Sequence, residues 1–178
     1  MKYIGVFCSA RDVADKYIEP AREFARLLTK RGYHLVWGGT DKGLMKVVAD
    51  EVQKGGGKLS GVSVTFLKDI ARKDADEMII TNDLGERKAV MLAKANGIIA
   101  LSGGTGTLDE ITAIIEEKKL RLHDKPIVIL NTAGFYAGLK LQLETIHKEG
   151  FLNRDLSELV YVTDTPAQAI EYLDRALA

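Results

Sequence analysis

Short apolar runs alternate along the chain with longer segments in which apolar residues recur at helical spacing. The runs are four to six residues long, most are rich in Val and Ile, and they are apolar almost throughout. This pattern is typical of strands that helices cover on both faces. We therefore predict seven strands, at residues 3–7, 34–37, 59–64, 77–80, 97–101, 126–130 and 159–162.

The intervening segments are amphipathic and predict helices. In the first, Ile18, Phe24 and Leu28 fall on one stripe. Gly32 stands where the C-terminal cap of this helix belongs, and Pro20 is expected near its first turn. The repeated alternation predicts an α/β fold, with a doubly wound, mostly parallel sheet and helices on both faces. The further helices are expected over residues 44–53, 87–95, 108–120, 135–148 and 166–177.

Nothing in the sequence divides the chain, so residues 1–178 are expected to form one domain. The three glycines at 55–57 lie between a predicted helix and a predicted strand, and are interpreted as a helix stop and a tight turn. Residues 65–76 form a charged stretch before the next strand. A short helix and an active-site flap both fit this stretch.

The charge balance limits the kinds of partner. The chain has 25 Lys and Arg against 25 Asp and Glu, a formal net charge of zero, and 46% hydrophobic residues. This composition excludes disorder and argues against a nucleic-acid partner, because a phosphate polymer attracts an excess of cations. A single small anion is still allowed, since a few backbone amides and one or two Arg can bind it.

Cysteine usage and hydropathy bear on location. Cys8 is the single cysteine, so no intramolecular disulfide can form, and a reducing cytoplasm is expected. No stretch approaches the about 18 apolar residues of a membrane span, and the first apolar run is too short for a signal peptide. No membrane partner is therefore expected.

Two glycine-rich loops follow predicted strands and open predicted helices. Ligands of a doubly wound sheet bind beyond the carboxyl ends of its strands, where both loops lie. Glycine lets an anion approach the backbone amides, and the helix dipole favours negative charge there, so we expect a phosphate in one of the loops. The candidate contacts are Gly38, Gly39, Gly43 and Met45 in the first loop, and Ser102, Gly103, Gly104, Thr105, Gly106 and Thr107 in the second.

Neither loop carries a common nucleotide signature. A dinucleotide-binding loop has Gly at i, i+2 and i+5, and a P-loop has Lys and then Ser or Thr after its last Gly. From Gly38 the i+2 position is Thr40, and from Gly104 the i+5 position is Asp109. Dinucleotide binding and ATP hydrolysis are therefore disfavoured. No metal site is expected, because the three histidines are scattered.

A carboxylate and a guanidinium remain as candidate chemistry. Glu110 lies one helical turn beyond Gly106, and Arg87 with Lys88 begins the helix after another strand at the same sheet edge. Structural explanations fit as well, because helix dipoles favour acids in a first turn and an Arg-Lys pair at a helix start is often a solvated face. The residues alone leave both explanations open.

The second loop resembles a family motif. The segment GGTGTLDE at 103–110 is similar to the PGGxGTxxE motif of the LONELY GUY family. Arg87-Lys88 with Met91 resembles the upstream MHxRKxxM segment of that family, at a matching separation. The GG…GLM pattern at 38–45 agrees as well, and the likeness spans nearly the whole chain.

The resemblance implies a Rossmann-type homodimer that hydrolyses AMP or an N6-modified AMP such as a cytokinin riboside 5′-monophosphate. The products would be the free base and ribose 5-phosphate, with no cofactor required. Carried over from the family, the catalytic pair is Arg87 and Glu110, and the phosphate would lie on the amides of residues 104–107. Many family members were once labelled lysine decarboxylases, but no lysine in this chain is marked as a Schiff-base residue.

The chain departs from the family pattern at four places. Ser102 replaces the leading Pro, Thr40 replaces a Gly of the first loop, and Lys46 replaces the Gly that follows GLM. Leu84 and Gly85 replace the Met-His of the upstream segment. The last change alters the expected wall of the base pocket, so it affects the expected cytokinin preference more than nucleotide binding.

A non-hydrolytic alternative uses the same loops. Some family relatives resemble carriers of phosphate-bearing cofactors such as the molybdenum cofactor, and a nucleotide sensor that acts through a dimer partner is a third possibility. The presence of both Arg87 and Glu110 favours the enzyme. Ser9, after the first strand, is a further candidate pocket hydroxyl, whereas Cys8 is interpreted as a small buried hydrophobe.

Overall fold

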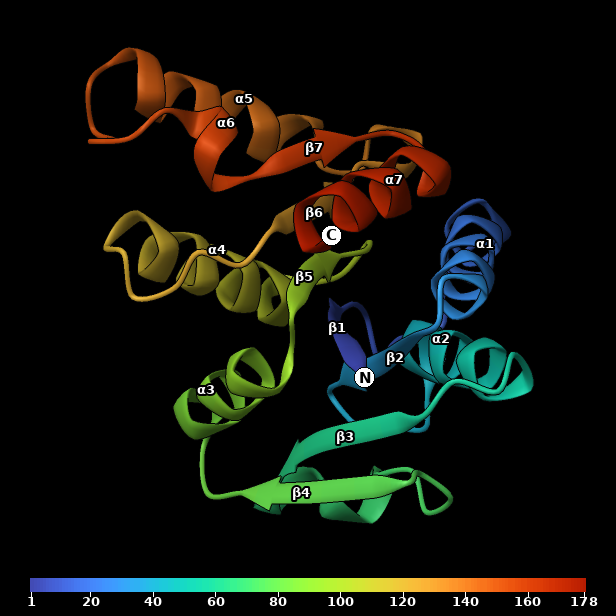
Figure 1. The fold of residues 1–178 in the computed structure, drawn as a ribbon. Helices are drawn as coiled ribbons and strands as arrows, with labels where there is room; N and C mark the ends of the chain where they lie inside the picture. The colour runs from blue at the N-terminus through green and yellow to red at the C-terminus, as the bar shows by residue number, and fades with distance from the viewer.

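The computed structural model describes all 178 residues, and its centre is one seven-stranded sheet (Figure 1). The strand order is β4-β3-β2-β1-β5-β6-β7, and every neighbouring pair is parallel. This confirms the doubly wound, parallel sheet predicted from the alternation of elements. The strands are β1 Lys2–Phe7, β2 Tyr33–Trp37, β3 Leu59–Val64, β4 Glu77–Thr81, β5 Gly97–Ala100, β6 Ile127–Leu130 and β7 Tyr161–Thr163.

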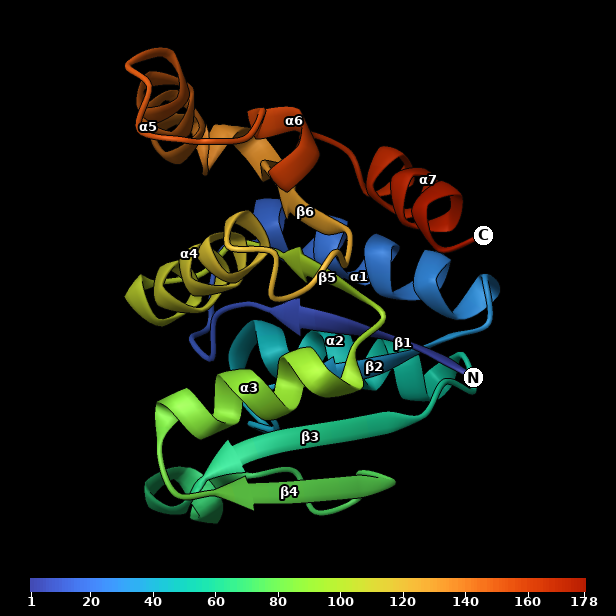
Figure 2. The ribbon, with the colours of Figure 1, turned by 60° about the vertical axis from the view of Figure 1, so that its left-hand side comes forward.

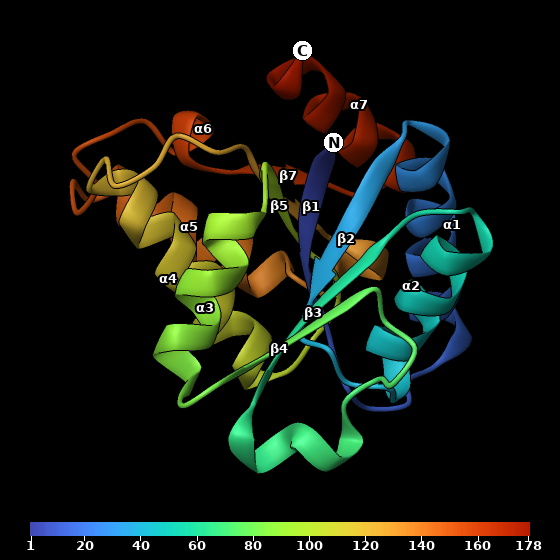
Figure 3. The same cartoon turned by 60° about the horizontal axis from the view of Figure 1, so that its bottom comes forward.

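Helices cover both faces of the sheet (Figure 3). On one face, Phe24 of α1 and Leu173 of α7 belong to one buried core, which α2 completes. On the other face, Met91 of α3 and Ile111 of α4 belong to a second core, which α5 and α6 complete. The helices are α1 Asp15–Lys30, α2 Gly43–Lys54, α3 Leu84–Lys94, α4 Thr105–Lys119, α5 Ala137–Lys148, α6 Leu156–Leu159 and α7 Pro166–Leu177, with short 3-10 helices η1 Thr65–Ile70 and η2 Thr132–Gly134.

The seven predicted strands are confirmed, and apart from the short helices α6 and η2, which were not predicted, the differences lie at element ends. β7 begins two residues later than predicted, because Leu159 ends the short helix α6. α3 begins at Leu84 rather than residue 87, since the Asp83 carboxylate caps it by accepting the amide of Glu86 at 2.8 Å. α4 begins at Thr105 rather than residue 108, because the glycine-rich segment itself forms its first turn.

Helix α1 contains one correct and one wrong prediction. Gly32 has φ +74° and follows the last turn, as a C-terminal glycine does. Pro20 was expected near the first turn, but α1 already begins at Asp15, so this proline lies in the second turn. It removes the donor for the carbonyl of Lys16, which is an exposed residue whose carbonyl water can reach.

The stretch left open between residues 65 and 76 is a short helix followed by one bridge residue and a series of bends. η1 covers its first half, and residue Ala71 then forms an antiparallel bridge with Thr40 of the first glycine loop. The amide of Arg72 donates to the carbonyl of Gly39 at 2.8 Å. Backbone contacts therefore fasten this stretch to the glycine loop.

The topology places a ligand site between β1 and β5. The chain winds outward from β1 to β4 on one side and continues from β5 to β7 on the other, so strand order reverses between β1 and β5. The strands point toward one edge, at which α3 and α4 begin (Figure 2). Such a reversal opens a crevice at the carboxyl ends of the strands. None of the helices is both long enough and apolar enough to cross a membrane.

Candidate active site

A cavity of about 240 Å³ lies at this reversal. Its walls come from the loop after β1, from α2, from α3 and from the start of α4. Segments far apart in the sequence thus meet because their strands are neighbours in the sheet. The lining residues are Cys8, Ser9, Ala10, Arg11, Met45, Arg87, Gly104, Thr105, Gly106, Thr107 and Glu110.

Arg87 is buried and held by two hydrogen bonds. Only 7% of the residue is exposed. Its Nε donates to the carbonyl oxygen of Val62 on β3 at 2.9 Å, and its Nη1 donates to Oε1 of Glu110 at 2.8 Å. The first bond ties the guanidinium to the sheet, so the second is made in one orientation. A residue this buried does not lie on a solvated helix face, so that explanation for Arg87 is excluded.

Glu110 lies in the second turn of α4 and is 5% exposed. Burial raises the pKa of its carboxyl group to about 7, the charge of Arg87 opposes that shift, and the charge of Asp109 adds to it. Both protonation states are therefore populated near neutral pH. A carboxyl group with such a pKa can accept a proton from water and release it again.

The start of α4 offers free donors to the same cavity. The first helical amide with a backbone acceptor is that of Leu108, which donates to Gly104 at 3.1 Å, and no side chain caps the helix. The preceding amides of Thr105, Gly106 and Thr107 are thus available. Unpaired amides and the positive end of the helix dipole bind anions, so this end of the cavity suits a phosphate.

The second glycine loop includes residues outside the cavity lining. A Cβ at Gly103 would overlap the side chain of Thr107, which is 4% exposed, so glycine here lets the loop pack tightly. Ser102 is buried, its carbonyl accepts the amide of Ser9 at 3.2 Å, and its hydroxyl has no hydrogen-bond partner. Both residues shape the loop from behind the cavity wall.

Of the predicted first-loop contacts, only Met45 lines the cavity. A Cβ at Gly38 would overlap the Arg87 guanidinium and come within 2.9 Å of Cε of Met45. Gly39 and Gly43 have positive φ angles of 73° and 55°, and Gly43 packs against the carbonyl of Arg11. These glycines make room for the cavity wall and are not among its lining residues.

Lys88 does not line this cavity and is paired with Asp109. Its Nζ lies 2.9 Å from Oδ2 of Asp109. It lines a smaller cavity of about 40 Å³, which also touches Arg87 and Glu110. The smaller cavity shares Arg87, Gly106 and Glu110 with the main one, so Lys88 lies next to the pair without lining the main cavity.

The residue that sequence reasoning missed is Arg11. It lines the cavity beside Cys8 and Ala10, directly after β1. Its position directly after the central strand was a usable signal, since ligands of such a sheet bind beyond the carboxyl ends of the strands. Cys8 is 2% exposed, and burial raises the pKa of its thiol, so it stays protonated, as expected of a small buried hydrophobe.

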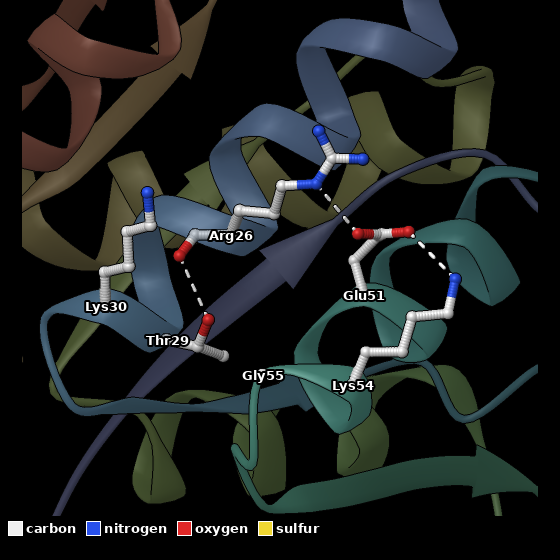
Figure 4. Close-up of a pocket in the computed structure, with 6 residues that line it drawn as sticks. All are labelled: Arg26, Thr29, Lys30, Glu51, Lys54 and Gly55. Atoms are coloured by element: carbon white, nitrogen blue, oxygen red, sulfur yellow. Dashed lines mark hydrogen bonds and ion pairs between the residues drawn. The ribbon is translucent and has the colours of Figure 1, made fainter.

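A second cavity, of about 310 Å³, lies where α1 and α2 end (Figure 4). Arg26 and Lys54 there contact opposite oxygens of Glu51, at 2.9 and 3.1 Å. Lys30 and Lys54 occupy the last turns of their helices, where the helix dipole attracts cations. These contacts account for the charges of this cavity without a ligand.

The fold and the cavity define a class of protein: a doubly wound parallel α/β domain with a buried Arg–Glu pair beside a helix N-terminus at the strand-order reversal. Residues 45–173 match the family described as possible lysine decarboxylase. The chain belongs to this family, the one that its LONELY GUY motifs indicated.

Named relatives cover most of the chain. It is 35% identical over 170 residues, 94% of its length and 91% of the relative's, to the cytokinin riboside 5′-monophosphate phosphoribohydrolase of Mycobacterium marinum. It is 34% identical over 169 residues, 94% and 90% of the two chains, to the protein of that name from Mycobacterium tuberculosis. A probable enzyme of that name from Oryza sativa is 34% identical over 95% of this chain and 70% of its own.

Solved structures share the fold. The molybdenum cofactor binding protein of Rippkaea orientalis matches with a TM-score of 0.77 at 20% identity, covering 99% of this chain and 98% of that one. The molybdenum cofactor carrier protein of Chlamydomonas reinhardtii matches with a TM-score of 0.74 at 24% identity, covering 99% of both chains. At these identities the likeness concerns the architecture alone.

Proposed function

We propose that this protein hydrolyses the N-glycosidic bond of an adenosine 5′-monophosphate, plain or N6-modified, to the free base and ribose 5-phosphate. One observation carries the proposal: Arg87 and Glu110 form a buried ion pair in the cavity that the unpaired amides of α4 also enter. A phosphate site and a carboxyl group with a pKa of about 7 thus lie in one cavity. The names of the relatives, phosphoribohydrolases, agree with this chemistry.

The phosphate is assigned to the start of α4. The amides of Thr105, Gly106 and Thr107 donate to its oxygens, and the helix dipole stabilises its charge. The hydroxyl of Thr105 adds a donor, since this residue is exposed at the cavity. Holding the phosphate there puts the ribose over Glu110, one turn further along the helix.

The hydrolytic step assigns separate roles to the pair. As the bond between C1′ and the base nitrogen breaks, its electron pair leaves with the base and positive charge develops on the sugar. The Glu110 carboxylate stabilises that charge and takes a proton from a water molecule whose oxygen bonds to C1′. That proton then passes from Glu110 to the departing base nitrogen, which restores the carboxylate. Arg87 orients Glu110 and the substrate, and assists departure of the base.

The decarboxylase description of the family does not fit this cavity. Decarboxylation of an amino acid through a Schiff base needs a lysine amine at the reacting centre. No lysine lines the cavity, and Nζ of Lys88 lies 2.9 Å from Oδ2 of Asp109.

The test is direct. Purified protein is incubated with AMP, with other nucleoside monophosphates and with isopentenyladenosine monophosphate, and release of base and ribose 5-phosphate is followed by chromatography. We expect release from at least one adenine monophosphate. Tight retention of nucleotide without release would overturn hydrolysis and support the carrier alternative.

Two further features belong to this proposal. We propose a homodimer, as the family resemblance implies, and the exposed Leu84 of α3 and Leu108 of α4 offer apolar surface for it. A single-chain mass in light scattering at micromolar concentration would contradict the dimer. We also propose a cytoplasmic location, because Cys8 is free and buried.

A further inference from the structure

Arg11 is a cation of the cavity whose charge no protein group neutralises. Two cationic residues line the cavity, and Arg87 uses its guanidinium on Val62 and Glu110. The guanidinium of Arg11 makes no hydrogen bond and no ion pair, and only its backbone amide is engaged. The start of α4, whose first amides are unpaired, lines the same cavity.

The backbone that carries Arg11 is held firmly. Its amide donates to Oγ of Ser9 at 2.9 Å. The carbonyl of Ser9 accepts the amide of Met45 at 3.0 Å, and the amide of Ser9 donates to the carbonyl of Ser102 at 3.2 Å. Gly43 packs directly against the carbonyl of Arg11. The loop after β1 is therefore tied to both glycine loops, which places the Arg11 Cα while leaving its side chain free.

We propose that Arg11 binds the phosphate of the substrate together with the unpaired amides at the start of α4, which line the same cavity. The inference rests on the proposed function and adds a residue to it. A guanidinium presents two parallel N–H donors to a phosphate, and such charge-assisted bonds are the strong ones. A free side chain on a fixed backbone loses only its own rotamer freedom when the ligand binds.

Steady-state kinetics of the Arg11→Ala and Arg11→Lys variants with AMP test this assignment. The Arg11→Ala change is expected to raise KM for AMP by about 10- to 100-fold with kcat within a few fold, since the lost bond acts on bound substrate and transition state alike. Arg11→Lys keeps the charge and should restore part of the affinity. Inhibition by ribose 5-phosphate should weaken in parallel. Arg175→Ala, in the last turn of α7, is the matched control.

The outcomes separate this assignment from the proposed function. Unchanged KM and ribose 5-phosphate inhibition in Arg11→Ala, with an active wild type, would overturn the role of Arg11 alone. A wild type that binds AMP in calorimetry but releases no base would overturn hydrolysis, and weaker AMP binding by Arg11→Ala would still support the phosphate contact. A wild type that neither binds nor cleaves AMP would overturn both.

Discussion

The guanidinium of Arg87 and the carboxylate of Glu110 meet at 2.8 Å from two helices on the same face of the sheet, 23 residues apart in the chain. Both residues are buried, and a second bond from Arg87 to the carbonyl of Val62 fixes the direction of approach. Burial raises the pKa of the Glu110 carboxyl group, while the hydrogen bond from Arg87 fixes the position of that group. Pairing and burial together suit Glu110 to proton transfer near neutral pH.

Glu110→Gln should abolish most of the hydrolytic activity with little change in shape. The amide cannot take a proton from water, so we expect turnover of AMP to fall by about 10²- to 10⁴-fold. Arg87→Ala should lose activity to a similar degree, because Glu110 then lacks its partner. The matched control is Glu116→Gln on the same helix, whose side chain is 53% exposed and contacts Lys119. Glu110→Gln protein that is folded by circular dichroism and still as active as the control would refute the assignment.

The rate should depend on pH through Glu110. The pKa of this group is raised to about 7, so the proton-accepting carboxylate is lost below that pH. We expect kcat/KM for AMP to fall about tenfold per pH unit on the acid side, with a midpoint near pH 7. Because the Asp109 charge raises the pKa, Asp109→Asn should shift the midpoint to lower pH. A flat profile between pH 5 and 8 would contradict the role of Glu110.

Gly38→Ala tests the close approach of the first glycine loop to the pair. Its Cβ would overlap the Arg87 guanidinium, so Arg87 must move. Moving the guanidinium out of its position beside Glu110 should lower kcat/KM by on the order of 100-fold. Gly138→Ala in α5 meets no atom within 4 Å, and should keep full activity and add up to about 1 kcal/mol of stability. Equal activity of the two variants would show that Arg87 tolerates the added methyl group.

Arg72 should matter for stability. It is 6% exposed and bonds Asp50 and Gln53 of α2, both at 2.6 Å, which fastens the segment after η1 to that helix. Arg72→Met should lower the free energy of unfolding by about 2 kcal/mol, less than for a fully buried pair because Asp50 is partly exposed. Arg22→Ala, which breaks a surface pair with Glu19, should change it by less than about 0.5 kcal/mol. Urea unfolding measures the free energy of unfolding of both variants. Equal urea midpoints for Arg72→Met and Arg22→Ala would exclude a stabilising role of the Arg72 contacts.

The sequence was most informative where structure is local. Strands such as β3, which is buried at every position, were predicted from nearly continuous apolar runs. The glycine-rich start of α4 was recognised from its motif. Element ends were less certain, because caps such as Asp83 act over single residues. The turn of α1 that contains Pro20 was predicted wrongly, because apolar spacing shows which face of a helix is buried but not at which residue the helix begins.

The sequence by itself determined the fold class, the two glycine loops and the candidate pair Arg87 and Glu110, because periodicity and motif spacing are properties of the chain order. Only the tertiary structure decided which residues share the cavity. Lys88 and the first-loop glycines are not among the lining residues of the main cavity, whereas Arg11 is. The physical reason is that burial and pairing depend on which strands are neighbours. The raised pKa of Glu110 and the free charge of Arg11 therefore exist only once β1 lies beside β5.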